Sequence, residues 1–232
     1  MDVVEEAADY VVVNKAPGQV VHPGAGQASG TLVAGLLARY PELDQLRRDE
    51  LCDPSRPGIV HRLDKGTSGL IVVARTSAGY LSLRDQLAKR EIERIYLGLV
   101  EGHVVESHGV VDAPIGRSTR TPTMMAVRAD GRWARTGYDV VSRLESPRTT
   151  MLRLKLETGR THQIRVHMAS IGHPVVNDSR YGHRRELRLE VNRVFLHAAR
   201  LAFADPKTGA WTARESVLPA DLSAIVSSGD VD

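Results

Sequence analysis

Residues 58–75 read GIVHRLDKGTSGLIVVAR, a polar loop punctuated by glycines that leads directly into five apolar residues. The apolar run at 70–74 is typical of a buried strand, and a loop that feeds the edge of a sheet is a common position for a ligand site. Asp64 lies in this loop between Arg62 and Lys65. Because nearby positive charge favours an ionised carboxylate, we expect Asp64 to be charged and poised as a nucleophile or base.

The charge pattern by itself is also typical of a surface cluster of ion pairs, which contributes little energy. The complete motif favours chemistry, because HRLDKGTSG at 61–69 resembles the signature loop of the RluA-type pseudouridine synthases, in which the aspartate is catalytic. Four more blocks resemble family segments and occur in the family's order, and the resemblance is to the RluD-like subgroup that acts on large-subunit ribosomal RNA. These blocks are YVVVNKAPGQVVHPG (10–24), REIERIYLGLV (90–100), LETGRTHQIRVHMASIGHPVVND (156–178) and LHAARLAF (196–203).

Arg165 is the second candidate site residue. The segment TGRTHQIRVHMASIG, 158–172, predicts a turn and a short helix ending near Gly172, with Ile164, Met168 and Ile171 on one apolar face. Arg165 lies about 100° from that face, so we expect it to point away from the core toward a neighbouring loop. A structural role, in which the arginine caps a carbonyl group, is the alternative. The resemblance implies an ion pair between Arg165 and the catalytic aspartate.

Tyr96 matches the strand in which the family places an active-site tyrosine, although a tyrosine on such a strand is usually a core residue. The resemblance implies that its ring stacks on the extruded uracil and that its hydroxyl takes part in proton transfer. Arg62 matches the arginine that fills the gap left by a flipped nucleotide, and Leu201 is expected in the apolar wall around the base. We expect His61, Arg62 and Lys65 of the loop to contact the RNA.

The net charge of +3 is distributed unevenly along the chain. Residues 1–115 carry a net charge of −4 and residues 201–232 one of −3, whereas residues 116–200 hold 17 Lys and Arg against 7 Asp and Glu. Most of these cations are arginines, which make forked contacts to phosphate and stack on bases, so the block favours an RNA partner. High arginine usage throughout the genome is the alternative explanation. The candidate phosphate contacts are Arg117, Arg120, Arg128 and Arg132.

The pattern of apolar residues predicts an α+β protein with a mostly antiparallel mixed sheet. Helices are expected at 31–40, after a Thr31 cap and before Pro41, and at 77–90. Residues 44–57 are expected to form a loop. Strands are expected at 10–14, 95–100, 133–144 and 151–156, with an Asp130-Gly131 hairpin signal and a closing hairpin around 204–209. The resemblance implies the pseudouridine synthase fold, a long bent sheet with surrounding helices and a central cleft.

Length and composition, with 42% hydrophobic and 25% charged residues, are typical of a globular protein. We expect one catalytic domain over 1–232, with no S4-type RNA-binding domain in this chain. No apolar run approaches the roughly 20 residues that span a bilayer, so we expect a cytoplasmic protein that has no membrane partner. The nine histidines form no metal motif, and the single Cys52 cannot form an internal disulfide. We expect no metal, no cofactor and a monomer.

The resemblance implies isomerisation of uridine to pseudouridine in RNA, with Asp64 either attacking C1′ or removing the 2′ proton on the way to a glycal. The sequence does not choose between these routes. The favoured substrate is 23S ribosomal RNA, and transfer RNA is the alternative. A non-catalytic RNA chaperone or ribosome assembly factor of the same fold, and a small-molecule hydrolase that uses Asp64, are the competing classes.

Overall fold

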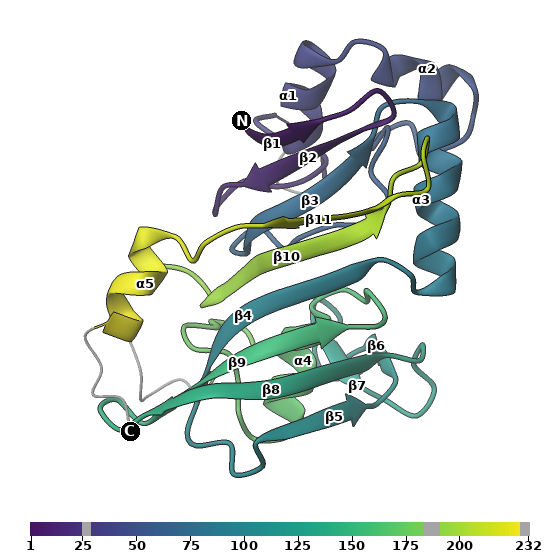
Figure 1. Ribbon diagram of the computed structural model, residues 1–232. Coiled ribbons are helices and arrows are strands. Elements are labelled where there is room, and N and C mark those ends of the chain that lie inside the picture. Colours follow the sequence, from purple (N-terminus) through teal and green to yellow (C-terminus); the bar gives the residue numbers. More distant parts are fainter. Residues whose placement is uncertain (25–28, 183–190, 228–232) are drawn as a thin grey trace. The chain divides into compact units, whose positions relative to one another are not determined.

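The computed structural model describes residues 1–24, 29–182 and 191–227, and the chain divides into two compact units (Figure 1). Unit 1 comprises Met1–Glu93 and Ala198–Ser216, and unit 2 comprises Arg94–His197 and Val217–Asp232. Each unit therefore combines segments that are far apart in the sequence. The count of one domain stays a prediction.

Unit 1 is built on an antiparallel sheet whose two central strands are buried along almost their whole length. Strands β2 (Tyr10–Lys15) and β3 (Ser68–Ala74) pair with each other, and β1 (Asp2–Glu6) pairs with β2. Strand β10 (Leu196–Ala204) begins in unit 2 and continues into unit 1, where it forms the predicted closing hairpin with β11 (Trp211–Glu215). The ring of Tyr10 meets that of Phe203 edge to face at 4.9 Å. These aromatic rings add to the apolar core that the valines of β2 and β3 form.

Two helices of unit 1 begin where the sequence predicts. The Thr31 side chain accepts a hydrogen bond from the Ala34 N–H and caps α1 (Leu32–Arg39), and the Thr76 side chain does the same for α3 (Ser77–Lys89) with the Gly79 N–H. Such caps satisfy N–H groups that have no partner within the helix. Both predicted helices are therefore confirmed.

A third helix lies where the sequence predicts a loop. Residues Leu43–Arg48 form α2, which begins at Glu42 without a side-chain cap. Its leucines, Leu43 and Leu46, are completely buried, and Asp44 pairs with both arginines at the end of the helix. A helix this short is marginal in water, so its stability comes from packing onto the rest of unit 1, which local sequence does not report.

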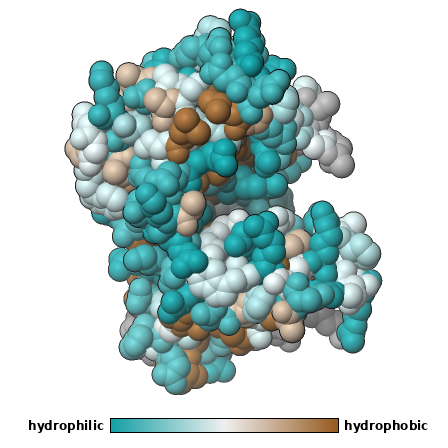
Figure 2. All heavy atoms as spheres, turned by 90° about the vertical axis from the view of Figure 1, so that its right-hand side faces the viewer, coloured by the Kyte–Doolittle hydropathy of each residue, from teal (hydrophilic) through white to brown (hydrophobic). Residues whose placement is uncertain are grey.

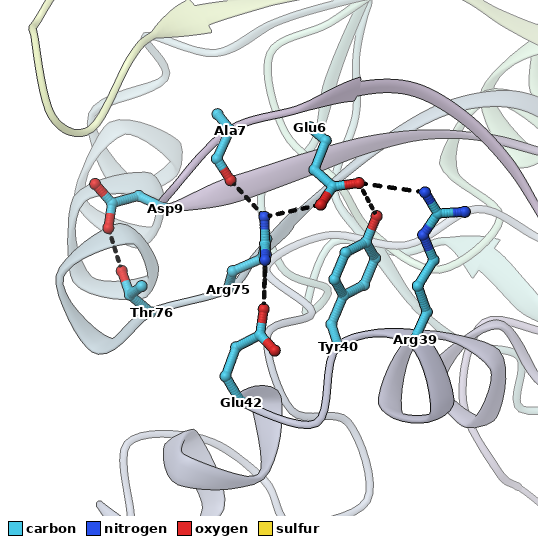
Figure 3. Close-up of polar contacts among 8 residues, drawn as sticks. All are labelled: Glu6, Ala7, Asp9, Arg39, Tyr40, Glu42, Arg75 and Thr76. Atoms are coloured by element: carbon cyan, nitrogen blue, oxygen red, sulfur yellow. Dashed lines mark hydrogen bonds and ion pairs between the residues drawn. The ribbon is translucent and has the colours of Figure 1, made fainter.

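Arg75 connects the end of β3 to the ends of neighbouring elements (Figure 3). Its guanidinium donates to Glu42 at 2.6 and 2.9 Å and to the Ala7 carbonyl at 2.8 Å, and it lies 4.6 Å from the centre of the Tyr40 ring. The Tyr40 hydroxyl in turn donates to Glu6 at 2.8 Å. This network fixes the far end of the strand that follows the Asp64 loop.

Unit 2 contains four neighbouring antiparallel strands, in the order β4-β9-β8-β5. These strands are β4 (Glu93–Glu101), β9 (Thr149–Leu156), β8 (Arg135–Leu144) and β5 (His108–Asp112). A separate two-stranded sheet, β6 (Ile115–Arg117) with β7 (Met125–Val127), lies between β5 and β8 in the sequence. The remaining elements are α4 (Gln163–Ser170) and α5 (Ala220–Ser227). Leu152, Leu154 and Leu156 are buried, as their alternation predicts.

The hairpin predicted at Asp130-Gly131 has its turn, but the predicted strand pairing is wrong. The Gly131 N–H does donate to the Arg128 carbonyl in a tight turn, but the flanking strands do not pair with each other. Strand β7 pairs with β6, whereas β8 pairs with β5 and β9. A turn signal fixes the local change of direction, and the choice of partner strand depends on the whole sheet.

The pairs β1–β2, β2–β3 and β10–β11 of unit 1, and β4–β9, β8–β9, β5–β8 and β6–β7 of unit 2, are antiparallel. The predicted α+β class with a mostly antiparallel sheet is confirmed. The face in Figure 2 is largely hydrophilic, and apolar residues show there only as small patches, which is ordinary for a protein surface. Within the described ranges, no helix is both long and apolar enough to cross a membrane.

Candidate active site

The Asp64 loop lies between two glycines that the backbone requires. Gly58 has φ +73°, and a Cβ there would lie 2.3 Å from the Ala74 carbonyl oxygen. Gly69 has φ +111°, and its Cβ would lie 2.3 Å from the Ala198 carbonyl oxygen. Only glycine tolerates both the positive φ and the close approach of a second backbone. The two ends of the loop are thus fixed against β3 and β10 within unit 1.

The backbone around Asp64 is held by contacts that the sequence did not reveal. The Thr67 N–H donates to the Asp64 carbonyl at 3.1 Å, and the Gly18 N–H donates to the Lys65 carbonyl at 2.8 Å. The fully buried Lys15 ammonium donates to the carbonyls of Ala16 and Gln19 at 2.8 and 2.9 Å, and to that of Lys65 at 3.5 Å. The Asp64 side chain is half-buried in this ordered loop. Lys15 is part of the NKAPG block, but nothing in that block distinguishes a buried lysine from an exposed one.

The two cations that flank Asp64 in the sequence lie on the surface of the loop. Arg62 and Lys65 are both exposed. The charge of Arg62 affects His22: burial first and this charge second lower the pKa of the histidine. The effect of Arg62 and Lys65 on the charge of Asp64 stays a prediction.

His61 has a structural contact in this loop. The Val72 N–H of β3 donates to its Nε2 at 3.1 Å, so the imidazole ties the loop to the strand. Leu201 on β10 is 1% exposed, opposite Arg214 of β11. The roles of His61 in RNA contact and of Leu201 in the wall around the base stay predictions.

Tyr96 lies on β4 in unit 2, opposite Leu154 of β9, and is 5% exposed. Arg94, two residues earlier and so on the same face of the strand, is also buried. Its guanidinium makes long hydrogen bonds to the carbonyls of Leu156 and Glu157, and burial lowers its pKa. The position of Tyr96 on a strand is as predicted, and its role stays a prediction.

Arg165 lies on α4, the predicted helix, but the expected amphipathic pattern is wrong. Every residue from Gln163 to Met168 is buried, whereas Ile171 is 38% exposed. Arg165 is itself buried, at 9% exposed. A helix enclosed on all sides has no polar face, so its polar side chains need partners. Gln163, for example, donates to the Arg135 carbonyl and to the Thr136 hydroxyl at 2.9 Å.

The buried guanidinium of Arg165 forms a two-pronged ion pair with Asp178. The Nε and Nη2 atoms lie 2.6 and 2.9 Å from the two carboxylate oxygens, and the Asp178 side chain is completely enclosed. Burial by itself raises the pKa of Asp178, but the hydrogen bond and charge of Arg165 outweigh it and hold the pKa below its ordinary value. Sequence reasoning missed Asp178, whose only signal is an acidic residue after the apolar run PVV. Asp64 is in unit 1 and Arg165 in unit 2, and a pair between them stays a prediction.

The four candidate phosphate contacts lie in and beside the β6–β7 hairpin. Arg117, Arg120 and Arg132 are exposed. Arg128 differs, because its guanidinium makes a two-pronged ion pair with Asp130 at 2.6 and 2.7 Å. Within the described residues, no group of three or more His, Cys, Asp or Glu is arranged to hold a metal ion.

Comparison with known proteins agrees with the loop motif and the fold. A model of the RNA pseudouridylate synthase family matches residues 9–170. The chain belongs to this family. It is 48% identical over 92% of its length to an uncharacterised RNA pseudouridine synthase of Chloroflexus aurantiacus, and 42% identical over 98% to ribosomal large subunit pseudouridine synthase D of Nitrosomonas europaea. It spans 64% and 65% of those two relatives.

Solved structures of family members share the architecture. The human RNA pseudouridylate synthase domain containing 1 aligns with a TM-score of 0.68 at 27% identity, over 97% of this chain and 93% of that one. The human domain containing 4 aligns with a TM-score of 0.72 at 21% identity, over 96% and 90% of the two chains. These alignments confirm the pseudouridine synthase fold that the motif predicts.

Proposed function

We propose that this protein isomerises specific uridines to pseudouridine in RNA. The observation that carries the proposal is the complete HRLDKGTSG loop of a family member, in which Asp64 is half-buried and its backbone is fixed by hydrogen bonds. A fixed carboxylate avoids the cost of ordering a nucleophile at the moment of reaction. The reaction cleaves the N-glycosidic bond, rotates the uracil and joins C5 to C1′. Because the product is an isomer of the substrate, the reaction needs no oxidant and no added group.

Within this proposal each site residue has a distinct role. Asp64 attacks C1′ or removes the 2′ proton, and Arg165 keeps the aspartate anionic and oriented. Tyr96 stacks on the detached uracil and assists proton transfer at C5, and Arg62 fills the space left by the everted nucleotide. Leu201 supplies part of the apolar wall that retains the base.

The favoured substrate is 23S ribosomal RNA. Support comes from relatives named ribosomal large subunit pseudouridine synthase D, such as those of Nitrosomonas europaea and Pasteurella multocida, the latter 41% identical over the whole chain. The exposed arginines of the β6–β7 hairpin would follow the phosphate backbone. Transfer RNA is the second candidate, and we propose that the protein acts as a monomer in the cytoplasm.

The deciding experiment replaces Asp64 by asparagine, which keeps the shape and removes the charge. We expect Asp64→Asn to abolish pseudouridine formation while RNA affinity changes by less than about threefold, because the loop's backbone contacts remain. The matched control is Asp205→Asn, another half-buried loop aspartate of unit 1, which should retain full activity. Undiminished turnover by Asp64→Asn would refute the assignment of the nucleophile.

The substrate is identified by mapping pseudouridines in total RNA from cells with and without the protein. We expect sites that disappear from 23S ribosomal RNA and return with the wild-type protein but not with Asp64→Asn. Loss of sites only in transfer RNA would select the second candidate. An unchanged map, with RNA binding retained, would instead favour a chaperone or assembly factor.

A further inference from the structure

The carboxylate of Asp178 is saturated with donors from two parts of unit 2. Arg165 of α4 supplies two N–H groups at 2.6 and 2.9 Å. The backbone N–H groups of Arg180 and Tyr181 supply two more, at 2.9 and 3.1 Å. Because the side chain is completely enclosed, these four contacts leave Arg165 little freedom. The proposed catalytic arginine is therefore anchored to the turn formed by residues 178–182.

Tyr181 holds Arg165 from a second direction. The guanidinium carbon lies 5.1 Å from the centre of the Tyr181 ring, within range of a cation–π contact. The hydroxyl of the same tyrosine accepts a hydrogen bond from the Met125 N–H of β7 at 3.0 Å and lies 2.9 Å from Nδ1 of His162, the residue that precedes α4. One side chain thus contacts the arginine, the start of its helix and the β6–β7 hairpin.

The 178–182 turn contacts the hairpin at a second point. The Arg180 side chain donates to the Thr123 carbonyl at 3.2 Å, two residues before the Met125 amide. Tyr181 also packs beside the buried cluster of Ile115, Ala134 and Val166, which joins the hairpin to α4. The turn is therefore hydrogen-bonded both to the second half of the hairpin, at Thr123 and Met125, and to Arg165.

We propose that Asp178 and Tyr181 are positioning residues that couple RNA contact at the β6–β7 hairpin to the orientation of Arg165. This inference rests on the proposed function, because it takes Arg165 as the group that orients Asp64. Asp178 fixes the guanidinium, and Tyr181 transmits the position of the hairpin backbone to it. RNA that is bound by the exposed arginines of the hairpin thereby sets the orientation of Arg165.

The two residues make different contributions, and kinetics separate them. Asp178→Asn replaces two charged acceptor oxygens by one neutral one, so Arg165 loses the two-pronged ion pair. We expect the single-turnover rate at saturating RNA to fall about 100-fold, with the dissociation constant nearly unchanged. Tyr181→Phe keeps the ring under Arg165 and removes only the hydroxyl. We expect it to weaken RNA binding about 2- to 10-fold and to lower the saturated rate as well, but by less than Asp178→Asn, because Asp178 still holds the guanidinium.

Asp221→Asn is the matched control. Asp221 of α5 pairs with Arg193 at 2.6 and 2.9 Å, the same two-pronged geometry in the same unit, but it has no contact with the 178–182 turn among the described residues. We expect this variant to retain the wild-type rate. Equal losses of rate in Asp178→Asn and Asp221→Asn would mean that Asp178 acts only through general stability, and an unchanged rate in Asp178→Asn would equally overturn the proposal.

A spectroscopic measurement tests the coupling without any turnover. The Nε–H signal of Arg165, assigned with Arg165→Lys, should be protected from solvent exchange in the wild type and in Asp221→Asn but not in Asp178→Asn. Adding a short uridine-containing stem-loop RNA should shift this signal in the wild type and not in Tyr181→Phe. A shift that persists in Tyr181→Phe would refute the coupling. A wild type that shows the coupling but forms no pseudouridine would refute the proposed function instead.

Discussion

At the residue scale, the Asp64 loop depends on side chains whose requirement is geometric. Gly69 is the sharpest case, because its φ is +111° and a Cβ would lie 2.3 Å from the Ala198 carbonyl oxygen. Lys15 is another, since its ammonium ties the carbonyls of two loops together. Neither residue takes part in the proposed chemistry, yet both decide whether Asp64 has a fixed position.

Gly69→Ala should therefore destabilise the protein. Strain at the positive φ and displacement of the β10 backbone together cost about 2–4 kcal/mol, measured as a lower midpoint of urea unfolding. Gly209→Ala is the control, because φ there is +72° but nothing lies within 4 Å of the new Cβ. It should cost only about 1 kcal/mol. Equal effects in the two variants would contradict the importance of the close approach.

At the element scale, the arginines of the β6–β7 hairpin differ in whether a carboxylate pairs with them. Arg117 and Arg120 are exposed, whereas Arg128 is held by Asp130. An arginine already paired with a carboxylate displaces fewer counterions when it meets a phosphate. The hairpin is thus expected to bind RNA mainly through Arg117 and Arg120.

Replacing Arg117 and Arg120 together by glutamine should flatten the salt dependence of RNA binding. Each lost phosphate contact lowers the slope of log K against log salt by about 0.7–0.9, whereas Arg128→Gln should change it less. Arg47→Gln with Arg48→Gln on α2, a pair of cations outside the basic block, should leave the slope unchanged. The measurement is a binding titration at several salt concentrations, and an unaltered slope in the Arg117 and Arg120 variant would show that these residues miss the phosphates.

At the scale of the whole molecule, we expect stability to depend on pH through two histidines, the partly buried His22 and the buried His167. Burial is the main cause that lowers the pKa of both His22 and His167. His167 is satisfied in its neutral form, with Nε2 donating to the Ala113 carbonyl and Nδ1 accepting from the Thr136 hydroxyl, both at 2.9 Å. A second proton on this ring would meet a hydroxyl that already receives a hydrogen bond from Gln163.

Stability should consequently fall as the solution becomes acidic. A histidine with a folded-state pKa below its unfolded value binds fewer protons when folded, so its contribution is complete above about pH 6.5 and is lost as pH falls below that value. We expect a lower urea midpoint at pH 5.5 than at pH 7.5. In His167→Gln the difference between the two midpoints should shrink. If it stays the same, His167 is not the source of the pH dependence.

Sequence reasoning worked where the signal is local. The cap at Thr31, the buried run of β3 and the alternation of β9 each depend on a few adjacent residues, and the structure confirms all of them. It failed where stability comes from distant contacts. Helix α2 forms because the rest of unit 1 covers its leucines, and β7 pairs with β6 rather than across the Asp130-Gly131 turn.

The amino-acid sequence by itself determined the family, the fold class and the candidate nucleophile, because a nine-residue loop motif and the periodicity of strands are written in consecutive residues. Only the tertiary structure decided that Arg165 is enclosed and fixed by Asp178, that Lys15 anchors the Asp64 loop, and that Arg128 has an internal counterion. The physical reason is the same in each case. Burial and ion pairing depend on which side chains the fold brings together, and those side chains can be far apart in the sequence.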